Sequence, residues 1–334
     1  MEKLKALVLP GAKALDRVCS GETREKIESY FYAKFNETGA ELTKEEQNNM
    51  LGEVDVLFTS WGSPVLDLDS LAKAPRLKYV GHAAGTVKGR VPFEAFGKGV
   101  RVFSAAGRIA ESVADWCMAT LMASLRRLTF FDYGMHNGVA WPSNEITGLG
   151  LLDMPVGIVS LSSTARAFIP MLKPFNCKIT AYDPYASPEL AQRLGVGMAS
   201  LEETMSQPVV SLHLPSLEAT RGMITKKMLA LIPDGGLLIN SSRGSVVDED
   251  ALIDELKSGR IYAALDVFKK EPLSLDSELR NLKNVLITPH VAGGTQQGYK
   301  SLMGCVVNDV ISAVEGNKQL TKFEIDSKRW DLLA

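Results

Sequence analysis

The chain has 334 residues, enough for two domains that each bury a core of their own. Hydrophobic residues make up 46% of the chain and charged residues 23%, as in an ordinary globular protein. The formal net charge of −2 excludes the strongly basic character that nucleic acid or an anionic membrane attracts. The cysteines are scattered without metal-ligand spacing, and no apolar run reaches transmembrane length. We therefore expect a cytoplasmic protein with reduced thiols and no metal.

The first hundred residues alternate between short apolar strands and helices. Strands are expected at 5–9, 54–58, 77–80 and 100–103. Helices are expected at 23–35, after the capping pair Thr43 and Glu46, at 68–72 and at 93–96. This alternation predicts a parallel, doubly wound α/β sheet, and we expect it to be flavodoxin-like. Trp61 and His82 follow two of its strands, where ligands bind, although a packing tryptophan and a core histidine are the commoner explanations.

A long helix is expected at 108–128, with apolar residues over much of its surface. A lone surface helix is not so apolar, so this helix is either deeply packed or a contact with a second subunit. The Gly- and Asn-containing stretch 134–150 is expected to be a loop.

A strand–turn–helix–strand unit follows and dominates the middle of the chain. An apolar strand at 156–159 leads through small residues into a helix at 167–175 and a second strand at 178–182. The second strand ends at Asp183, 18 residues after Ala165. A carboxylate at about 20 residues from such a turn is typical of a dinucleotide-binding βαβ unit, where it accepts hydrogen bonds from a ribose. A plain buried βαβ unit without a nucleotide is the alternative.

The turn of this unit departs from the glycine fingerprint GxGxxG. Ser160, Ser162 and Ala165 stand where the fingerprint has glycine. Serine and alanine are small enough to keep the close packing, but a position with positive φ costs roughly 1 kcal/mol or more without glycine. We therefore expect weaker cofactor binding if the turn needs such a conformation.

The second half continues as strand–helix pairs and predicts a Rossmann-type sheet. Strands are expected at 209–214, 237–240, 262–266 and 285–288, and helices after Ser200, at 226–232 and at 248–258. The residues from Tyr299 suit a helix that returns to the first domain. We place the substrate domain at 1–104 plus 296–334 and the NAD-binding domain at 105–295.

Charged side chains follow three consecutive strands of this second sheet. Arg243 comes after one strand, Asp266 closes the next with Glu271 just beyond, and His290 comes after the third. Arginine offers a forked donor for a carboxylate, and histidine is a proton donor near neutral pH whose ring a glutamate can orient. The set suits hydride transfer to a 2-keto acid. Each residue also has a structural explanation: a surface cap for Arg243, a turn residue for Glu271 and a structural histidine for His290.

These residues carry a resemblance to the D-isomer-specific 2-hydroxyacid dehydrogenases. The stretches that match include VGIVSLSSTARAFIPMLKPFNCKITAYDPY, LLINSSRGSVVDEDALIDELKSGRIYAALDVFKKEPL and NVLITPHVAGGT, in the order and spacing of the family. The resemblance implies a catalytic arginine at Arg243, a glutamate at Glu271 and a histidine at His290. It also implies cofactor contacts at Ser163, Thr164, Asp183, His213, Pro215, Ser241, Ser242, Asp266 and Gly293.

The resemblance thus predicts an NAD-dependent oxidoreductase that reduces a small 2-keto acid to the D-2-hydroxy acid. NAD is expected over NADP because no arginine follows Asp183 in the next four residues. A homodimer joined through the nucleotide domains is expected from the resemblance and from the apolar helix 109–125. The alternative is a catalytically weak or inactive dinucleotide-sensing protein of the same fold, which the missing glycines favour. Arg243, Glu271 and His290 favour the enzyme.

Overall fold

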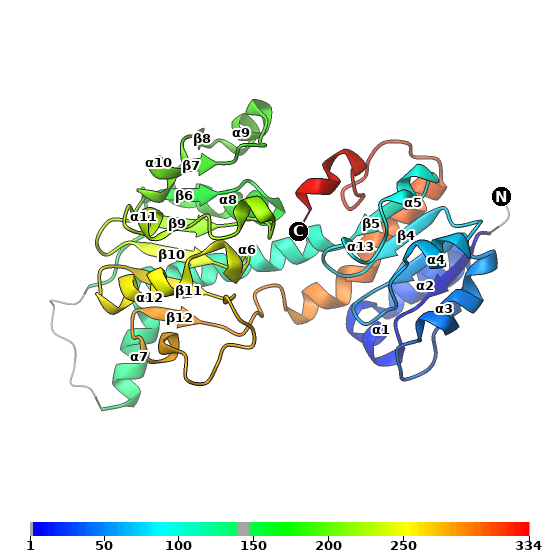
Figure 1. The fold of residues 1–334 in the computed structure, drawn as a ribbon, viewed down its shortest axis with the longest axis horizontal. Coiled ribbons are helices and arrows are strands. Elements are labelled where there is room, and N and C mark those ends of the chain that lie inside the picture. The colour runs from blue at the N-terminus through cyan, green and yellow to red at the C-terminus, as the bar shows by residue number, and fades with distance from the viewer. Residues whose placement is uncertain (1–2, 139–146, 334) are drawn as a thin grey trace. The chain divides into compact units, whose positions relative to one another are not determined.

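The computed structural model describes residues 3–138 and 147–333 (Figure 1). The chain divides into two compact units, each built on its own parallel sheet. The smaller unit contains Met1–Ile109 and Gly294–Ala334, and the larger contains Ala110–Gly293. Part of the predicted loop 134–150, residues 139–146, lies outside the described residues. Within the described residues, no helix combines the length and the apolar character needed to cross a membrane.

The sheet of the smaller unit has the strand order β2-β1-β3-β4-β5, with all pairs parallel. This is the flavodoxin-like order, so the predicted fold of this unit is confirmed. Its strands are β1 (Lys5–Val8), β2 (Tyr32–Phe35), β3 (Val56–Thr59), β4 (Tyr79–His82) and β5 (Arg101–Ser104). Its helices are α1 (Ala12–Val18), α2 (Gly21–Tyr30), α3 (Lys44–Met50), α4 (Leu68–Ala72), α5 (Glu94–Gly97) and α13 (Gln296–Val314).

The sheet of the larger unit has the order β12-β11-β10-β9-β6-β7-β8, again all parallel. Counted from β6, this is the Rossmann order with one further strand, as predicted. Its strands are β6 (Pro155–Val159), β7 (Lys178–Tyr182), β8 (Gly197–Met198), β9 (Val209–Leu212), β10 (Leu237–Asn240), β11 (Tyr262–Leu265) and β12 (Val285–Ile287). Its helices are α7 (Leu128–His136), α8 (Ser163–Leu172), α9 (Pro188–Leu194), α10 (Leu201–Met205), α11 (Lys226–Leu229) and α12 (Glu249–Lys257).

Helix α6 (Ala106–Leu125) supplies much of the core on one face of the larger sheet. Cys117 and Leu121 are fully buried there, in one cluster with Phe168 of α8 and Ile158 of β6. Deep packing, rather than a subunit contact, therefore accounts for the apolar character of this side of the helix.

Two predicted elements differ from the structure. The single helix expected at 23–35 is α2 followed by the strand β2, because Phe31 ends the helix and packs into the core at 2% exposure. The helix expected at 108–128 ends at Leu125 and is followed by a separate helix, α7, which was not predicted. Arg127 makes the break with a left-handed backbone at φ 52°.

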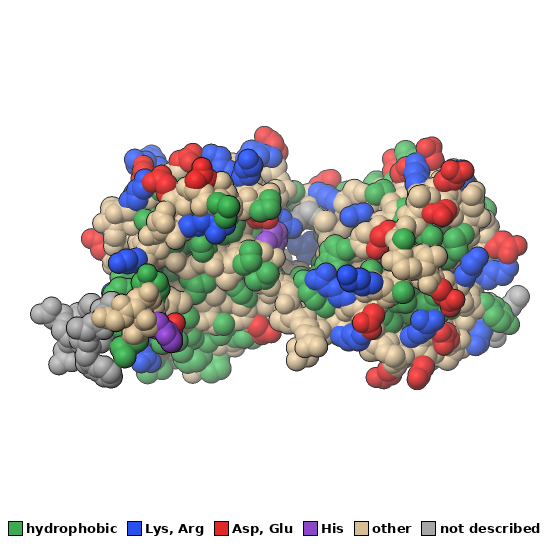
Figure 2. Space-filling view, turned by 90° about the horizontal axis from the view of Figure 1, so that it is seen from below, with side chains coloured by type: hydrophobic (Ala, Val, Ile, Leu, Met, Phe, Trp, Pro, Cys, Tyr) green, Lys and Arg blue, Asp and Glu red, His purple; other side chains and the backbone are tan. Residues whose placement is uncertain are grey.

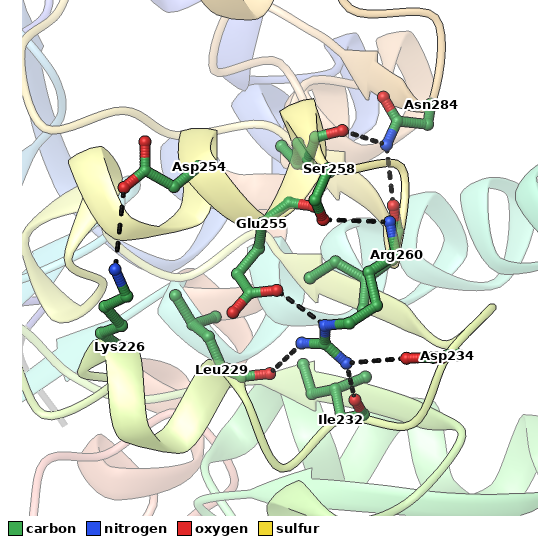
Figure 3. A network of polar contacts seen from close by, with 11 residues as sticks. Lys226, Leu229, Ile232, Asp234, Asp254, Glu255, Ser258, Arg260 and Asn284 are labelled. Atoms are coloured by element: carbon green, nitrogen blue, oxygen red, sulfur yellow. Dashed lines mark hydrogen bonds and ion pairs between the residues drawn. The ribbon is translucent and has the colours of Figure 1, made fainter.

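Arg260 holds together the loops at the amino end of β11 (Figure 3). Its guanidinium pairs with Glu255 at 2.7 Å and donates to the carbonyl oxygens of Leu229, at 2.9 Å, and of Ile232. These carbonyls lie at the C-terminal end of α11 and in the turn that follows it, where carbonyl groups have no hydrogen-bond donors within the helix. The arginine thus fixes the edge of the sheet opposite the one that carries the candidate site.

Candidate active site

His290 and Glu271 form a direct pair at the carboxyl edge of the larger sheet. His290 Nδ1 lies 2.6 Å from Glu271 Oε2, and the Phe268 amide donates to Glu271 Oε1 at 3.0 Å. An ionised carboxylate only accepts hydrogen bonds, so Nδ1 carries a hydrogen and Nε2 is the nitrogen left for proton exchange. The side chains are 50% and 34% exposed, which leaves the imidazole accessible to substrate and solvent.

The backbone at His290 has an unusual conformation that Asp266 supports. His290 has a φ of 53°, which a non-glycine residue adopts only when its surroundings hold it. Asp266, 1% exposed, accepts hydrogen bonds from the amides of Val291 at 2.9 Å and Ala292 at 2.8 Å. Thr288 Oγ1 donates to the same carboxylate at 2.5 Å. Asp266 therefore fixes both sides of the loop that carries His290.

Arg243 lies on the loop after β10, next to the strand that leads to Glu271. Asn240 shapes this loop, since its amide donates to the Arg243 carbonyl at 3.1 Å and its oxygen accepts from Ser242 Oγ at 2.8 Å. A Cβ built on Gly244 would lie 1.9 Å from the carbonyl carbon of Phe268. Only glycine therefore lets the Arg243 loop touch the backbone that holds Glu271. The Arg243 guanidinium is exposed, with one donor on the Ser242 carbonyl at 2.7 Å.

The turn between β6 and α8 keeps the shape of a dinucleotide-binding turn without its glycines. Ser160 has a φ of 76°, so the first fingerprint position does need a left-handed backbone. Ser162 is the N-cap of α8 with φ −62°, and Ala165 lies inside the helix, so neither of these positions needs glycine for its backbone. The amides of Ser163 and Thr164 open the helix, where N–H groups without helical partners can bind phosphate.

Asp183 closes this turn from the end of β7. Its Oδ2 accepts from the Leu161 amide at 2.8 Å and lies 3.4 Å from Ser160 Oγ, and its Oδ1 accepts from the Tyr185 amide at 2.8 Å. These bonds hold the carboxylate at the turn, with lone pairs left for a ribose diol. The helix N-terminus and this carboxylate together fit an adenine dinucleotide.

The other residues singled out in the sequence occupy varied surroundings. His213 is buried against Phe168, and its Nε2 lies 3.0 Å from Ser211 Oγ, while Nδ1 has no hydrogen-bond partner among the described residues. Burial lowers the pKa of His213 to about 3, so its ring is neutral. Ser241 Oγ lies 3.1 Å from the buried Cys117 Sγ. The Pro215 carbonyl accepts from Thr220 at 2.6 Å, and Gly293, the last residue of the larger unit, follows Ala292, whose amide donates to Asp266.

His82 and Trp61 belong to the smaller unit. His82 is 3% exposed with Nδ1 2.8 Å from Thr59 Oγ1, and burial together with the charge of Arg90 lowers its pKa to about 4. Trp61 packs edge-on against Tyr299 with ring centres 5.5 Å apart, and the Arg17 guanidinium lies 4.1 Å from the Tyr299 ring centre. His82 is thus a core histidine, and Trp61 is a packing aromatic that is still 39% exposed.

Comparisons with known proteins identify the family of the chain. The family model described as D-isomer specific 2-hydroxyacid dehydrogenase, NAD binding domain, matches residues 118–292. A D-3-phosphoglycerate dehydrogenase of Mycobacterium tuberculosis is 32% identical over 266 residues, which cover 79% of this chain and 50% of that protein. A glyoxylate reductase of Thermococcus litoralis is 33% identical over 272 residues, which cover 79% of this chain and 82% of the reductase.

Among solved structures, a phosphoglycerate oxidoreductase from Rhizobium etli superposes with a TM-score of 0.84 at 23% identity. The match covers 98% of this chain and 99% of that chain, and at this identity it concerns the fold alone. The chain spans about half the length of the D-3-phosphoglycerate dehydrogenases that it matches.

Proposed function

Because the chain belongs to the D-isomer specific 2-hydroxyacid dehydrogenases, we propose that it reduces a small 2-keto acid to the D-2-hydroxy acid with NADH. The observation that carries this proposal is the contact between His290 and Glu271 at 2.6 Å. A protein that only binds a dinucleotide has no use for an accessible histidine whose other nitrogen is held by a carboxylate.

The proposed reaction divides the work among three side chains. Bound NADH supplies the hydride for the keto carbon. His290 gives the proton on Nε2 to the carbonyl oxygen and regains one from solvent, and it removes that proton in the reverse direction. Glu271 keeps Nδ1 protonated and the ring oriented. Arg243, with a planar fork of donors, binds the substrate carboxylate and polarises the carbonyl.

Asp183 supports a preference for NAD over NADP. A carboxylate at this position accepts from a 2′-hydroxyl and repels a 2′-phosphate. Residues 184–187 contain no arginine that could neutralise such a phosphate. Comparable catalytic efficiency with NADH and NADPH would contradict this assignment.

One titration series tests the proposal. NADH fluorescence should change on binding, and absorbance at the NADH band should fall on addition of glyoxylate, hydroxypyruvate or pyruvate. Oxidation of 3-phosphoglycerate with NAD tests the activity for which several of the relatives are named. Binding of NADH without turnover of any of these acids would instead support the dinucleotide-sensing alternative, which the replaced glycines favour.

We further propose that two copies associate through the larger unit. Helix α7 buries none of its residues, and Leu128, Tyr133 and Met135 are 55%, 61% and 55% exposed. So apolar a helix is stable in water when a second copy covers it. On the face shown in Figure 2, hydrophobic side chains are exposed between charged side chains of both signs. Light scattering should give a dimer for the wild type and a monomer for Tyr133→Glu.

A further inference from the structure

Arg166 lies in the first turn of α8, the helix whose N-terminus suits the cofactor phosphates. It is the fourth residue of α8, and its side chain runs back toward the start of the helix, as side chains on a helix do. Its Nε donates to the Ser162 carbonyl at 3.3 Å, and its Nη2 donates to Ser163 Oγ at 3.3 Å. The guanidinium is therefore held beside the two residues at which the helix begins.

This placement of a cation does not serve the helix itself. The N-terminus of a helix is its positive end, so a positive charge there is unfavourable and an acid is favourable. Helices α9, α10 and α12 of the same unit carry an acid in the first turn, whereas α8, like α7 and α11, carries none. The first turn of α8 thus combines the helix dipole with a guanidinium, and both attract a multiply charged anion.

The replaced glycines indicate a function for the Arg166 guanidinium. Glycine at the second fingerprint position lets the pyrophosphate approach the backbone closely. Here Ser162 occupies that position and its side chain makes no cap bond to the helix. A phosphate held farther from the amides loses part of their attraction, and a forked arginine can restore it through hydrogen bonds to the phosphate oxygens.

We propose that Arg166 binds the pyrophosphate of NAD(H) and offsets the loss of close approach at Ser162. This inference rests on NAD binding by the larger unit. It assigns a side chain to a contact that the glycine fingerprint leaves to the backbone, and neither sequence patterns nor the resemblance had marked this residue.

Arg166→Gln tests the proposal, because glutamine keeps a donor for the Ser162 carbonyl and a good helix propensity while removing the charge. Arg193→Gln, an exposed arginine of α9 in the same unit, is the matched control. Equilibrium binding is measured by fluorescence for NADH and by competition for ADP-ribose, which has the pyrophosphate, and for adenosine, which lacks it. Circular dichroism checks that both variants are folded.

Arg166→Gln should weaken NADH and ADP-ribose by about tenfold to a hundredfold, the size of a charged hydrogen bond, and should leave adenosine unchanged. The control should bind all three as the wild type does. Adding Ser162→Gly should tighten NADH more in the Arg166→Gln background than in the wild type. Affinities for NADH and ADP-ribose within twofold of the wild type, or an equal effect on adenosine, would overturn the role of Arg166. A wild-type chain that does not bind NADH would overturn the cofactor assignment instead, and this proposal with it.

Discussion

The replacement Ser160→Gly should stabilise the larger unit, although it removes a hydrogen-bonding side chain. At φ 76° the serine has a strain of roughly 1–2 kcal/mol that glycine relieves. Against this, glycine adds about 0.4–1 kcal/mol of unfolded-chain entropy, and the contact of Ser160 Oγ with Asp183 at 3.4 Å is too long to contribute more than about 0.5 kcal/mol. The expected net gain in the free energy of unfolding is about 0.5 kcal/mol.

Ser162→Gly is the matched control, because Ser162 has φ −62° and no strain to relieve. It carries the same entropic cost and should lower the free energy of unfolding by about 0.5–1 kcal/mol. In urea unfolding, the free energy of unfolding should be higher than that of the wild type for Ser160→Gly and lower for Ser162→Gly, with about 1 kcal/mol between the two variants. If Ser160→Gly were the less stable of the two, the hydroxyl contact with Asp183 would outweigh the backbone strain and our interpretation of the turn would be wrong.

Four further changes test the site and the fold. His290→Gln should lower kcat for keto-acid reduction by about 10² to 10⁴ with NADH affinity unchanged, and a small loss would remove His290 as the proton donor. Asp266→Asn places an amide opposite the Val291 and Ala292 donors, so steady-state kinetics should show a lower kcat; a loss of NADH affinity with kcat intact would instead favour a nicotinamide contact. His213 has a pKa of about 3 in the folded protein against an ordinary 6.5, so below pH 6.5 it takes up a proton on unfolding. The free energy of unfolding should therefore fall by up to about 1.4 kcal/mol for each pH unit below 6.5. Urea unfolding of His213→Leu at several pH values should show a smaller fall, and parallel curves for variant and wild type would contradict this. Arg260→Met removes the donor of the Leu229 and Ile232 carbonyls and of Glu255, and it should lower the free energy of unfolding in urea by about 2 kcal/mol. The control Lys226→Ala, in the exposed pair with Asp254, should lower it by less than about 0.5 kcal/mol.

The sequence predicted the elements whose pattern is local. The capping pairs at Thr43 and Ser200 open helices as expected, because both partners of each pair lie within four residues. The strand at 237–240 and the helix at 68–72 have the predicted bounds, since each is bounded by turn residues. The two types of parallel sheet followed from the alternation of strands and helices together with the family resemblance.

Other features depended on residues far apart in the chain. Tyr30, Phe31 and Phe35 fit a helical spacing, and only packing of the 32–35 segment beside β1 makes it a strand. Helix α7 was missed because it has no buried face to give it a periodic pattern. The role of Asp266 could not be inferred, because its hydrogen-bond donors lie more than 20 residues away on the loop after β12.

The turn after β6 shows why a sequence fingerprint and the site that it marks are separable. The three glycines of the fingerprint meet three different physical needs, and each need can be compared separately with the residue that replaces the glycine in this turn. The first is a left-handed backbone, which Ser160 adopts while Asp183 holds the adjacent Leu161 amide. The third is close packing of helix on sheet, which a fully buried Ala165 still allows. The second is room for phosphate at Ser162, which side-chain volume reduces, and on our proposal the charge of Arg166 offsets this loss. A cofactor site can therefore persist without its fingerprint wherever each lost glycine served a need that another group can meet.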